Sequence, residues 1–385
     1  MKIYGIVMEA NPFHNGHQYF INKIKEQYNA DIIISITSTS FTMRGDISVM
    51  DKFSKTKELL NNNVDIVLEL PFNNAVQSAD YFSKNAIALL SKIGINHLAF
   101  GTENVCIDFY EKCYKCIKNY KTITNKLSQK QNISLWLEKN NFSSEEINIF
   151  NQPNFTLSFQ YYKYVKDNDL DIIITPIERV GNNYHDTIVT SNLASATSLR
   201  TLLNENKDIS NYIPNNDYIY INENQSLNNL LLLLKNEFYI KNINSMNNVL
   251  FNEGIINYIR NNGNFNNTYK DLVYSLKNKK YSISRLNRVF LHSLINSNEE
   301  IAQDTNYLRL LGVSNKGLEY VKTLSKDIKD LIFSSPNEIT SLNDNIKKNL
   351  EIELKATKLY EILTNNHTLY QKEYQLPIRK ERIWI

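Results

Sequence analysis

The first 200 residues alternate short apolar runs with longer amphipathic segments. Continuous isoleucine runs at 32–34 and 172–174 are typical of parallel strands that are buried on both faces. Such alternation predicts βαβ units and therefore a parallel sheet. The expected strands are residues 3–7, 31–35, 66–69, 97–100 and 171–176, and the expected helices are residues 18–28, 51–61, 75–92, 109–120, 135–139 and 155–166.

Beyond Arg200 the strand patterns fade and apolar residues recur at helical spacing. The expected helices there are residues 227–240, 246–260, 269–276, 283–295 and 346–363, several of them separated by asparagine-rich turns. The sequence therefore predicts an α/β domain with a parallel sheet over residues 1–210. An α-helical domain is expected over residues 211–385.

A histidine loop, Asn11-Pro12-Phe13-His14-Asn15-Gly16-His17, connects the first expected strand to the first expected helix. Backbone N–H groups and the helix dipole favour phosphate at a helix N-terminus, and a glycine there allows close approach to the backbone. Two imidazoles can donate to phosphate oxygens as charge builds up in the transition state of adenylyl transfer. A metal pair or two ordinary loop histidines are the alternatives. The strand–loop–helix context favours the phosphate site.

Further polar segments follow other expected strands, where ligands bind in parallel α/β sheets. These segments are residues 38–46, 100–104, 152–154 and 176–200. Gly101 would admit an adenine or a ribose against the backbone. Ser195 or Thr197 can cap a helix, and Arg200 one turn later would let the same helix mouth bind the β- and γ-phosphates. Arg179 and the segment Tyr184-His185-Asp186 lie close in sequence to the same strand end.

Composition indicates a globular protein, with 42% hydrophobic and 22% charged residues among 385. No signal peptide opens the chain, and its most apolar run, 230–234, is much shorter than the ~20 residues of a transmembrane helix. Cys106, Cys113 and Cys116 are too few for a disulfide framework, and packing explains them better than metal ligation. We therefore expect a cytoplasmic protein that has neither a membrane segment nor a protein-held metal site.

Positive charge is concentrated between residues 260 and 288. This stretch has seven basic residues against one acidic residue, Asp271, and it carries Tyr269, Tyr274 and Tyr281. Such a composition is typical of a surface that contacts a nucleic-acid backbone, although a solvated face is the alternative. The basic residues are Arg260, Lys270, Lys277, Lys279, Lys280, Arg285 and Arg288.

Two of these motifs carry a family resemblance. The histidine loop resembles the HxGH signature of the nucleotidyltransferase superfamily, which is related to class I aminoacyl-tRNA synthetases. Ser195-Ala196-Thr197-Ser198-Leu199-Arg200 resembles that superfamily's S-S-T-x-x-R phosphate motif. More narrowly, the chain resembles the bacterial tRNA(Met) cytidine acetate ligase family over nearly its full length. The similar stretches are residues 9–17, 43–46, 69–71, 77–79, 100–103, 153–154, 179–186, 195–200, 284–288 and 374–378.

This resemblance implies a Rossmann-like HUP domain and an AMP-forming ligase. Enzymes of the family use ATP, which usually carries Mg²⁺, to activate acetate as acetyl-adenylate. They then acetylate N4 of the wobble cytidine, position 34, of elongator tRNA(Met) and release AMP and diphosphate. The helical half with its basic stretch would hold the tRNA.

The resemblance also implies site residues. His14 and His17 would stabilise the α-phosphate, and Arg200 would lie near the leaving diphosphate with Ser195 and Thr197. The whole expected ATP site is Val7, Met8, Glu9, Ala10, Asn11, Pro12, Phe13, His14, Asn15, Gly16, His17, Gln18, Tyr19, Phe20, Gly101, Asn154, Arg179, Ser195 and Thr197.

The chain departs from the family pattern at three single positions and in residues 177–181, which keep Arg179 and Gly181 but alter their neighbours. Ala10 replaces a common tyrosine, Met43 a common glutamine and Asp46 a common glutamate. Two other functions therefore stay open. One is a cofactor adenylyltransferase, although such enzymes are usually much shorter and do not need a basic helical half. The other is a nucleotide- or tRNA-binding protein that has lost catalysis.

Overall fold

The computed structural model describes residues 1–124, 127–179, 194–242, 250–251, 254–297, 307–341 and 344–380. Its strands are β1 Ile3–Val7, β2 Ile32–Ser38, β3 Ile66–Leu70, β4 His97–Thr102, β5 Ile173–Glu178, β6 Leu308–Val313, β7 Ile332–Phe333 and β8 Ile378–Arg379. Its α-helices are α1 Asn15–Glu26, α2 Lys52–Asn61, α3 Phe72–Ala75, α4 Ala79–Lys92, α5 Ile107–Ile117, α6 Gln129–Lys139, α7 Ser144–Phe150, α8 Pro153–Asp167, α9 Ala196–Asn204, α10 Glu223–Lys235, α11 Ile255–Asn262, α12 Tyr269–Leu276, α13 Ile283–Ile295, α14 Asn315–Thr323, α15 Lys326–Lys329, α16 Asp344–Thr364 and α17 Leu369–Lys372. Shorter helical turns lie at Ser210–Tyr212, Asn236–Ile240 and Pro336–Ser341.

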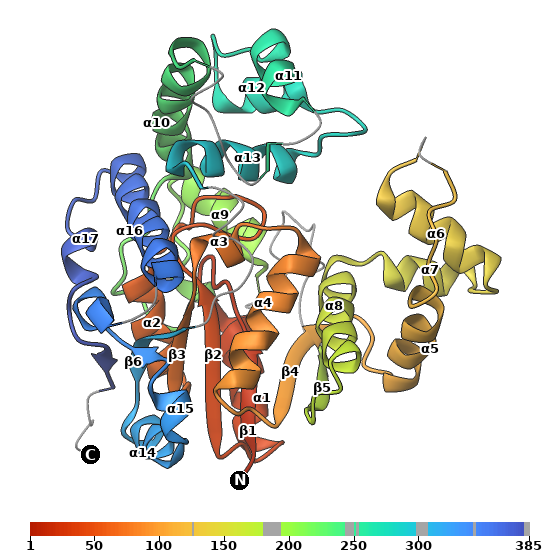
Figure 1. Ribbon diagram of the computed structural model, residues 1–385, viewed down its shortest axis with the longest axis vertical. Helices are drawn as coiled ribbons and strands as arrows, with labels where there is room; N and C mark the ends of the chain where they lie inside the picture. The colour runs from red at the N-terminus through yellow and green to blue at the C-terminus, as the bar shows by residue number, and fades with distance from the viewer. Residues whose placement is uncertain are drawn as a thin grey trace.

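The central sheet has the strand order β5-β4-β1-β2-β3-β6-β7, and its first five strands are parallel (Figure 1). The chain runs from β1 through β2 to β3 on one side, then returns to place β4 and β5 on the other side of β1. The order in which the chain adds strands to the sheet therefore reverses between β1 and β4. In open α/β sheets, such a reversal opens a crevice at the carboxyl ends of the two strands, where ligands bind.

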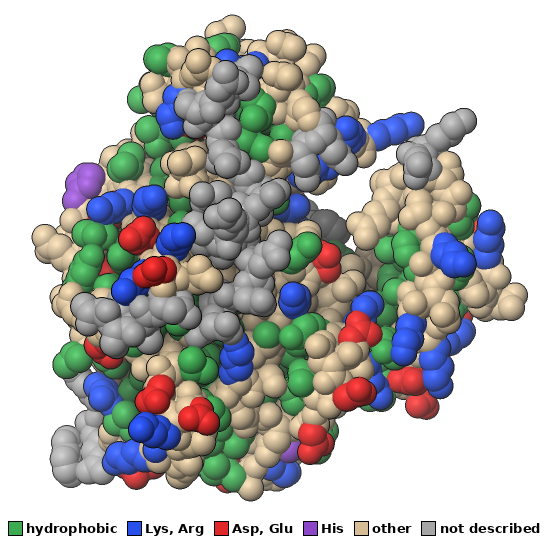
Figure 2. All heavy atoms as spheres, in the orientation of Figure 1, with side chains coloured by type: hydrophobic (Ala, Val, Ile, Leu, Met, Phe, Trp, Pro, Cys, Tyr) green, Lys and Arg blue, Asp and Glu red, His purple; other side chains and the backbone are tan. Residues whose placement is uncertain are grey.

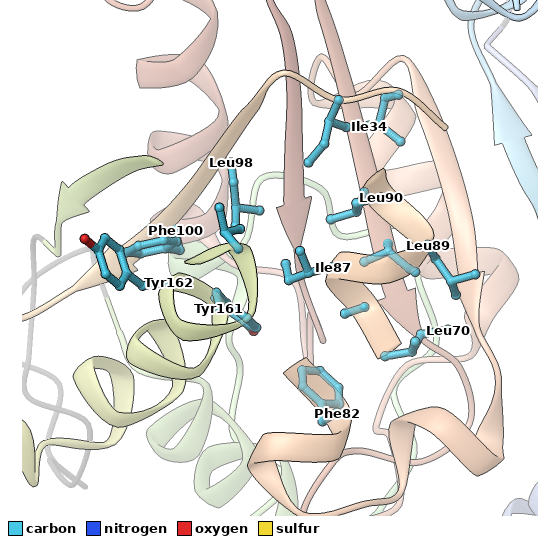
Figure 3. Packing of buried hydrophobic residues seen from close by; sticks show 14 of the residues in the cluster. Ile34, Leu70, Phe82, Ile87, Leu89, Leu90, Leu98, Phe100, Tyr161 and Tyr162 are labelled. Atoms are coloured by element: carbon cyan, nitrogen blue, oxygen red, sulfur yellow. The ribbon is translucent and has the colours of Figure 1, made fainter. Parts of the chain in front are cut away.

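Helices cover both faces of this sheet. Ile32, Ile34 and Ile36 of β2 pack in one core with α4 and α8, whereas Ile33 packs in a second core with α1 and α2. Figure 3 shows the first core, where Ile87 and Leu90 of α4 approach the sheet beside the tyrosines of α8. The isoleucine run of β2 is thus buried on both faces, as the sequence predicts.

The second isoleucine run does not behave in the same way. We expected residues 172–174 to be buried on both sides, but β5 is an edge strand and Ile173 is 59% exposed. Only β4 pairs with it, so one side of this strand has no neighbour in the sheet. A run of isoleucines indicates a strand but does not give its place in the sheet.

The C-terminal half contains strands that the sequence pattern missed. Helices make up most of residues 211–385, as predicted, but β6 pairs antiparallel with β3 and extends the N-terminal sheet. β7 and β8 then pair with β6. Leu308–Val313 is short and buried on both faces, so it shows no alternation, and its partner lies far away in the sequence. The domain boundary near residue 210 stays a prediction.

Helices α10 to α13 and α16 share a separate hydrophobic cluster above the carboxyl edge of the sheet (Figure 1). Phe41, from the loop after β2, and Phe72, at the start of α3, pack into it. Tyr269 and Tyr281 are buried in the same cluster, so only Tyr274 of the three tyrosines in the basic stretch is exposed. Cys113 is buried in the first core, where burial raises the pKa of its thiol to about 12. None of the described helices is both long and apolar enough to span a membrane.

Candidate functional site

The histidine loop forms the N-terminal cap of α1. His14 is the N-cap residue, and its Nδ1 accepts a hydrogen bond from the backbone N–H of Gly16 at 3.1 Å. Nδ1 of His17 accepts one from the backbone N–H of His14 at 3.2 Å. The two bonds make a reciprocal capping box, in which imidazoles occupy the positions usually held by Ser or Thr and by Glu. The two ring centroids lie 3.8 Å apart.

This capping arrangement fixes the chemistry of both rings. Because each Nδ1 accepts a backbone proton, each neutral ring carries its own proton on Nε2. Burial lowers the pKa of His14 to about 3, helped by the charges of Arg179 and Arg200. Burial, His14 and Arg179 lower the pKa of His17 as well. The helix mouth therefore presents two neutral imidazoles with Nε2–H donors.

The rest of the loop is held by contacts to other elements. Ala10 has a positive φ of 47°, and the Asn11–Pro12 peptide bond is cis. Oδ1 of Asn11 accepts from the backbone N–H of Val49 at 2.8 Å. The carbonyl of Asn11 accepts from Nη1 of Arg200, also at 2.8 Å. Arg200 of α9 is thereby tied directly to the histidine loop.

A single cavity of about 520 Å³ opens over this loop, at the crevice between β1 and β4. This volume lies within the range of ~300–1,000 Å³ that is usual for small-molecule sites. The predicted ATP-site residues that line it are Val7, Met8, Glu9, Ala10, Asn11, His14, Gly16, His17, Tyr19, Phe20, Gly101, Asn154, Arg179, Ser195 and Thr197, together with the predicted catalytic residue Arg200.

Four residues of the predicted ATP site do not line the cavity. Phe13 is buried in the core beneath the loop, and Pro12 precedes it. Nδ2 of Asn15 donates to the carbonyl of Asn211, and Nε2 of Gln18 donates to Asn62. Asn15 and Gln18 thus fasten α1 to neighbouring segments.

One wall of the cavity comes from β4, β5 and α8. The carboxylate of Glu103 accepts from the backbone N–H of Phe155 and from Nδ2 of Asn154, both at 2.6 Å. Nη1 of Arg179 donates to Oδ1 of Asn154 at 3.0 Å. A Cβ on Gly101 would lie 3.2 Å from Cγ of Arg179, so glycine leaves room for that arginine. A planar group can approach the backbone of β4 there.

A second wall is the N-terminus of α9. Oγ of Ser195 accepts from the backbone N–H of Ser198, which confirms Ser195 as the N-cap. Nη2 of Arg200 donates to Oγ1 of Thr197 at 3.4 Å. Arg200 also lies 3.5 Å from Glu223, so part of its charge is balanced. Tyr184, His185 and Asp186 lie outside the described residues.

The third wall includes residues that sequence reasoning placed only in part. Segment 38–46 was expected at a strand end, and Thr42, Met43, Arg44 and Asp46 do line the cavity. Phe82 of α4 and Tyr161 of α8 line it as well. They were missed because apolar and aromatic residues at helical spacing are read as core, and both side chains also pack in the first core.

Glu9 lines this third wall, and the charge of the buried Lys55 behind it acts on the Glu9 carboxyl. Burial raises the pKa of Glu9, although the backbone N–H of Met43 and the charge of Lys55 oppose that change. Burial lowers the pKa of Lys55 to about 8, despite the charges of Glu9 and Asp51. Nζ of Lys55 donates to the carbonyls of Ser38 and Thr39. Glu9, two residues before the histidine loop, thus adds an acidic group to the lining of the cavity.

These features describe a site for a phosphorylated nucleotide. Two neutral donors at a helix N-terminus, two arginines and a second helix N-terminus surround one crevice, which is the chemistry that stabilises a phosphoryl group and a leaving anion. In the part of the chain that the structure describes, no group of three or more His, Cys, Asp or Glu side chains is arranged to hold a metal ion.

Comparisons with known proteins agree with this geometry. The sequence profile described as HIGH Nucleotidyl Transferase matches residues 1–375. The tRNA(Met) cytidine acetate ligase of Clostridium kluyveri is 31% identical, over all of both chains. The enzyme of the same name from Oceanobacillus iheyensis is 30% identical, over 97% of this chain and 98% of that protein.

Two solved structures have the same fold. The apo form of Thermotoga maritima TmcAL superposes with a TM-score of 0.84 at 24% identity, and it covers 98% of this chain and 99% of its own. The form of that protein bound with alpha-thio ATP gives a TM-score of 0.83 at 22% identity, with 99% and 100% covered.

Proposed function

The chain belongs to the tRNA(Met) cytidine acetate ligase family, and we propose that it activates acetate with ATP and acetylates N4 of the wobble cytidine of elongator tRNA(Met), releasing AMP and diphosphate. One observation carries the proposal for the site. The Nε2–H groups of His14 and His17 and the guanidinium groups of Arg179 and Arg200 belong to residues that line one cavity at the β1/β4 reversal.

In the first half-reaction, a carboxylate oxygen of acetate attacks the α-phosphorus of ATP and diphosphate leaves. His14 and His17 donate to the oxygens of the α-phosphate as their charge grows, and they need no proton transfer to do so. Arg200 and the N-terminus of α9 hold the leaving diphosphate. Gly101, Asn154 and Arg179 border the adenosine. The product is the mixed anhydride acetyl-adenylate.

In the second half-reaction, the cytidine N4 attacks the acetyl carbonyl carbon and AMP leaves. A base from an anticodon loop can be turned out of its stack and bound between protein side chains. The basic stretch between residues 260 and 288 supports the proposal that the helical half contacts the tRNA. Mg²⁺ arriving with ATP, and a cytoplasmic location, stay predictions.

The two other functions left open by the sequence fit less well. Relatives with the ligase name match over the whole chain, including the helical half that a small adenylyltransferase does not need. The grouping of His14, His17, Arg179 and Arg200 around one cavity favours an active enzyme over a protein that has lost catalysis.

The test uses the intact protein with ATP, labelled acetate and unmodified elongator tRNA(Met). After digestion of the RNA, we expect label in N4-acetylcytidine. Pyrophosphate exchange that depends on acetate, without labelled RNA, would reduce the function to acetate activation. Exchange that does not depend on acetate would contradict the proposal.

A further inference from the structure

The third wall of the cavity contains an acidic group that phosphate binding does not use. Oε1 of Glu9 accepts the backbone N–H of Met43 at 2.7 Å, which fixes the carboxyl between the loops that follow β1 and β2. Its second oxygen accepts no hydrogen bond from the described residues, and Glu9 lines the cavity. A carboxylate is unsuited to hold the phosphates of ATP, because like charges repel. It is suited to accept hydrogen bonds from an amine.

The surroundings of Glu9 suit a flat aromatic base. Met43, Phe82 and Tyr161 line the same cavity, and the ring of Tyr161 lies 5.9 Å from that of Phe100. Figure 3 shows that α4 carries Phe82 and that α8 carries Tyr161. The hydroxyl of Tyr161 has no hydrogen bond to the described residues, although burial and Glu9 raise its pKa. It remains available to a bound ligand.

This wall leads directly to the basic helices. Nη1 of Arg288 in α13 lies 3.5 Å from the carbonyl of Met43, and Nδ2 of Asn287 donates to Asp46 at 3.3 Å. A Cβ on Gly45 would lie only 2.7 Å from the backbone nitrogen of Arg288, so the loop and the helix are in close contact. Residues 43–46 thus connect α13 to Glu9 through direct contacts.

We propose that Glu9 is a catalytic residue of the acetyl-transfer step. Its carboxylate accepts a hydrogen bond from the amino group of cytidine and then takes a proton from that group. This inference rests on the proposed function. Carboxylates are the side chains that pair with cytosine N4–H₂. Met43, Phe82 and Tyr161 border the base, and the adenylate lies against His14 and His17 on the other side.

The lone pair of cytidine N4 is delocalised into the ring, so the amine is a weak nucleophile. As N4 forms its bond to the acetyl carbon, the bond from that carbon to the AMP oxygen breaks and AMP leaves with the electron pair. The N4 proton passes to the carboxylate of Glu9 and from there to water. General-base help of this kind contributes ~10²–10⁴-fold to a rate.

Glu9→Gln tests the assignment, because an amide oxygen can still accept the N–H of Met43. We expect acetate-dependent pyrophosphate exchange and tRNA affinity to fall by much smaller factors than acetyl transfer does. Transfer from synthetic acetyl-adenylate to tRNA should fall by about 100-fold or more. His17→Ala should show the opposite ratio, with exchange reduced far more than transfer from supplied acetyl-adenylate. Glu26→Gln, the same change at the exposed end of α1, should match wild type.

Each other result has a defined meaning. Equal losses in exchange and in transfer would place Glu9 in acetate activation and overturn the inference, as would a loss explained by weaker tRNA binding. Transfer at the wild-type rate would overturn it too. If wild type itself formed no acetylcytidine, the proposed function would fail, not the role of Glu9 alone. Transfer by wild type should also rise with pH through the pKa of Glu9, whose carboxyl faces Arg44, Asp46, Lys55 and Tyr161.

Discussion

The ammonium group of Lys52 lies 2.9 Å from the carboxylate of Glu353, joining α2 to α16 across 301 positions of sequence. Both side chains are buried, together with Glu69, Arg309 and Glu373. Lys52 and Arg309 each contact Glu69 and Glu373. Glu69 belongs to one of the stretches shared with the family, and its contacts are structural. This network fastens the C-terminal segment to the nucleotide-binding sheet.

We expect Lys52→Met to lower the free energy of unfolding by about 3–5 kcal/mol, because it leaves three buried carboxylates facing one arginine. Urea titration followed by circular dichroism measures this change. Lys322→Met removes an exposed ion pair with Glu319 and should cost less than about 1 kcal/mol. Similar losses in the two variants would contradict the structural role of the network.

The two roles of His14 can be separated by substitution. His14→Ala removes both the N-cap and the Nε2–H donor, and it should lower stability by about 0.5–2 kcal/mol. His14→Asn restores a cap acceptor, so its stability should return close to that of wild type. Acetate-dependent pyrophosphate exchange should fall ~10²–10³-fold in both variants, because neither has the donor. Recovery of exchange in the asparagine variant would show that capping is the only role of His14.

The buried histidines predict acid instability. His292 of α13 is buried against the carbonyl of Val76, and burial lowers its pKa to about 4. The unfolded state takes up a proton near pH 6.5 and the folded state does not, so the stability from this group is complete above pH 6.5 and is lost as the pH falls toward 4. Protonation of His292 in the unfolded state lowers the free energy of unfolding by about 2 kcal/mol between pH 7 and pH 5. His292→Gln should show a pH dependence smaller by that amount, as measured by urea unfolding at both pH values.

The exposed lysines around α12 should determine the salt dependence of tRNA binding. The connection between α12 and α13 extends away from helices α10 to α13 in Figure 1. Figure 2 shows basic side chains in the same region. Lys277→Glu, Lys279→Glu and Lys280→Glu should each weaken tRNA binding and reduce the slope of log affinity against log salt by about one. Pyrophosphate exchange should not change.

Lys326→Glu and Lys329→Glu are matched controls for those variants. They lie on α15, at the opposite end of the molecule from α12 in Figure 1. Their tRNA affinity and salt slope should equal those of wild type. Equal effects at both places would mean that tRNA responds only to the overall charge of the protein.

Local sequence predicted most elements of the α/β half, because the apolar pattern that marks each strand or helix lies within a single segment of the chain. The strand–loop–helix order placed His14 and His17 at a helix mouth, and Tyr269–Leu276 and Ile283–Ile295 were predicted to the residue. Periodicity could not show that β6 joins β3, since that pairing depends on residues more than 200 positions apart.

The sequence by itself determined the histidine loop, the parallel strands and the helical second half, because their signals are spacing, capping and periodicity within one segment. Tertiary structure alone decided which side chains meet. It assigned both Nδ1 atoms to helix capping, bonded Gln18 to Asn62 and brought Tyr161 to the cavity. It also bonded the carboxyl of Glu9 to the backbone of Met43 at the wall of the cavity. Burial, pairing partners and pKa shifts depend on neighbours from distant segments, and no local pattern encodes them.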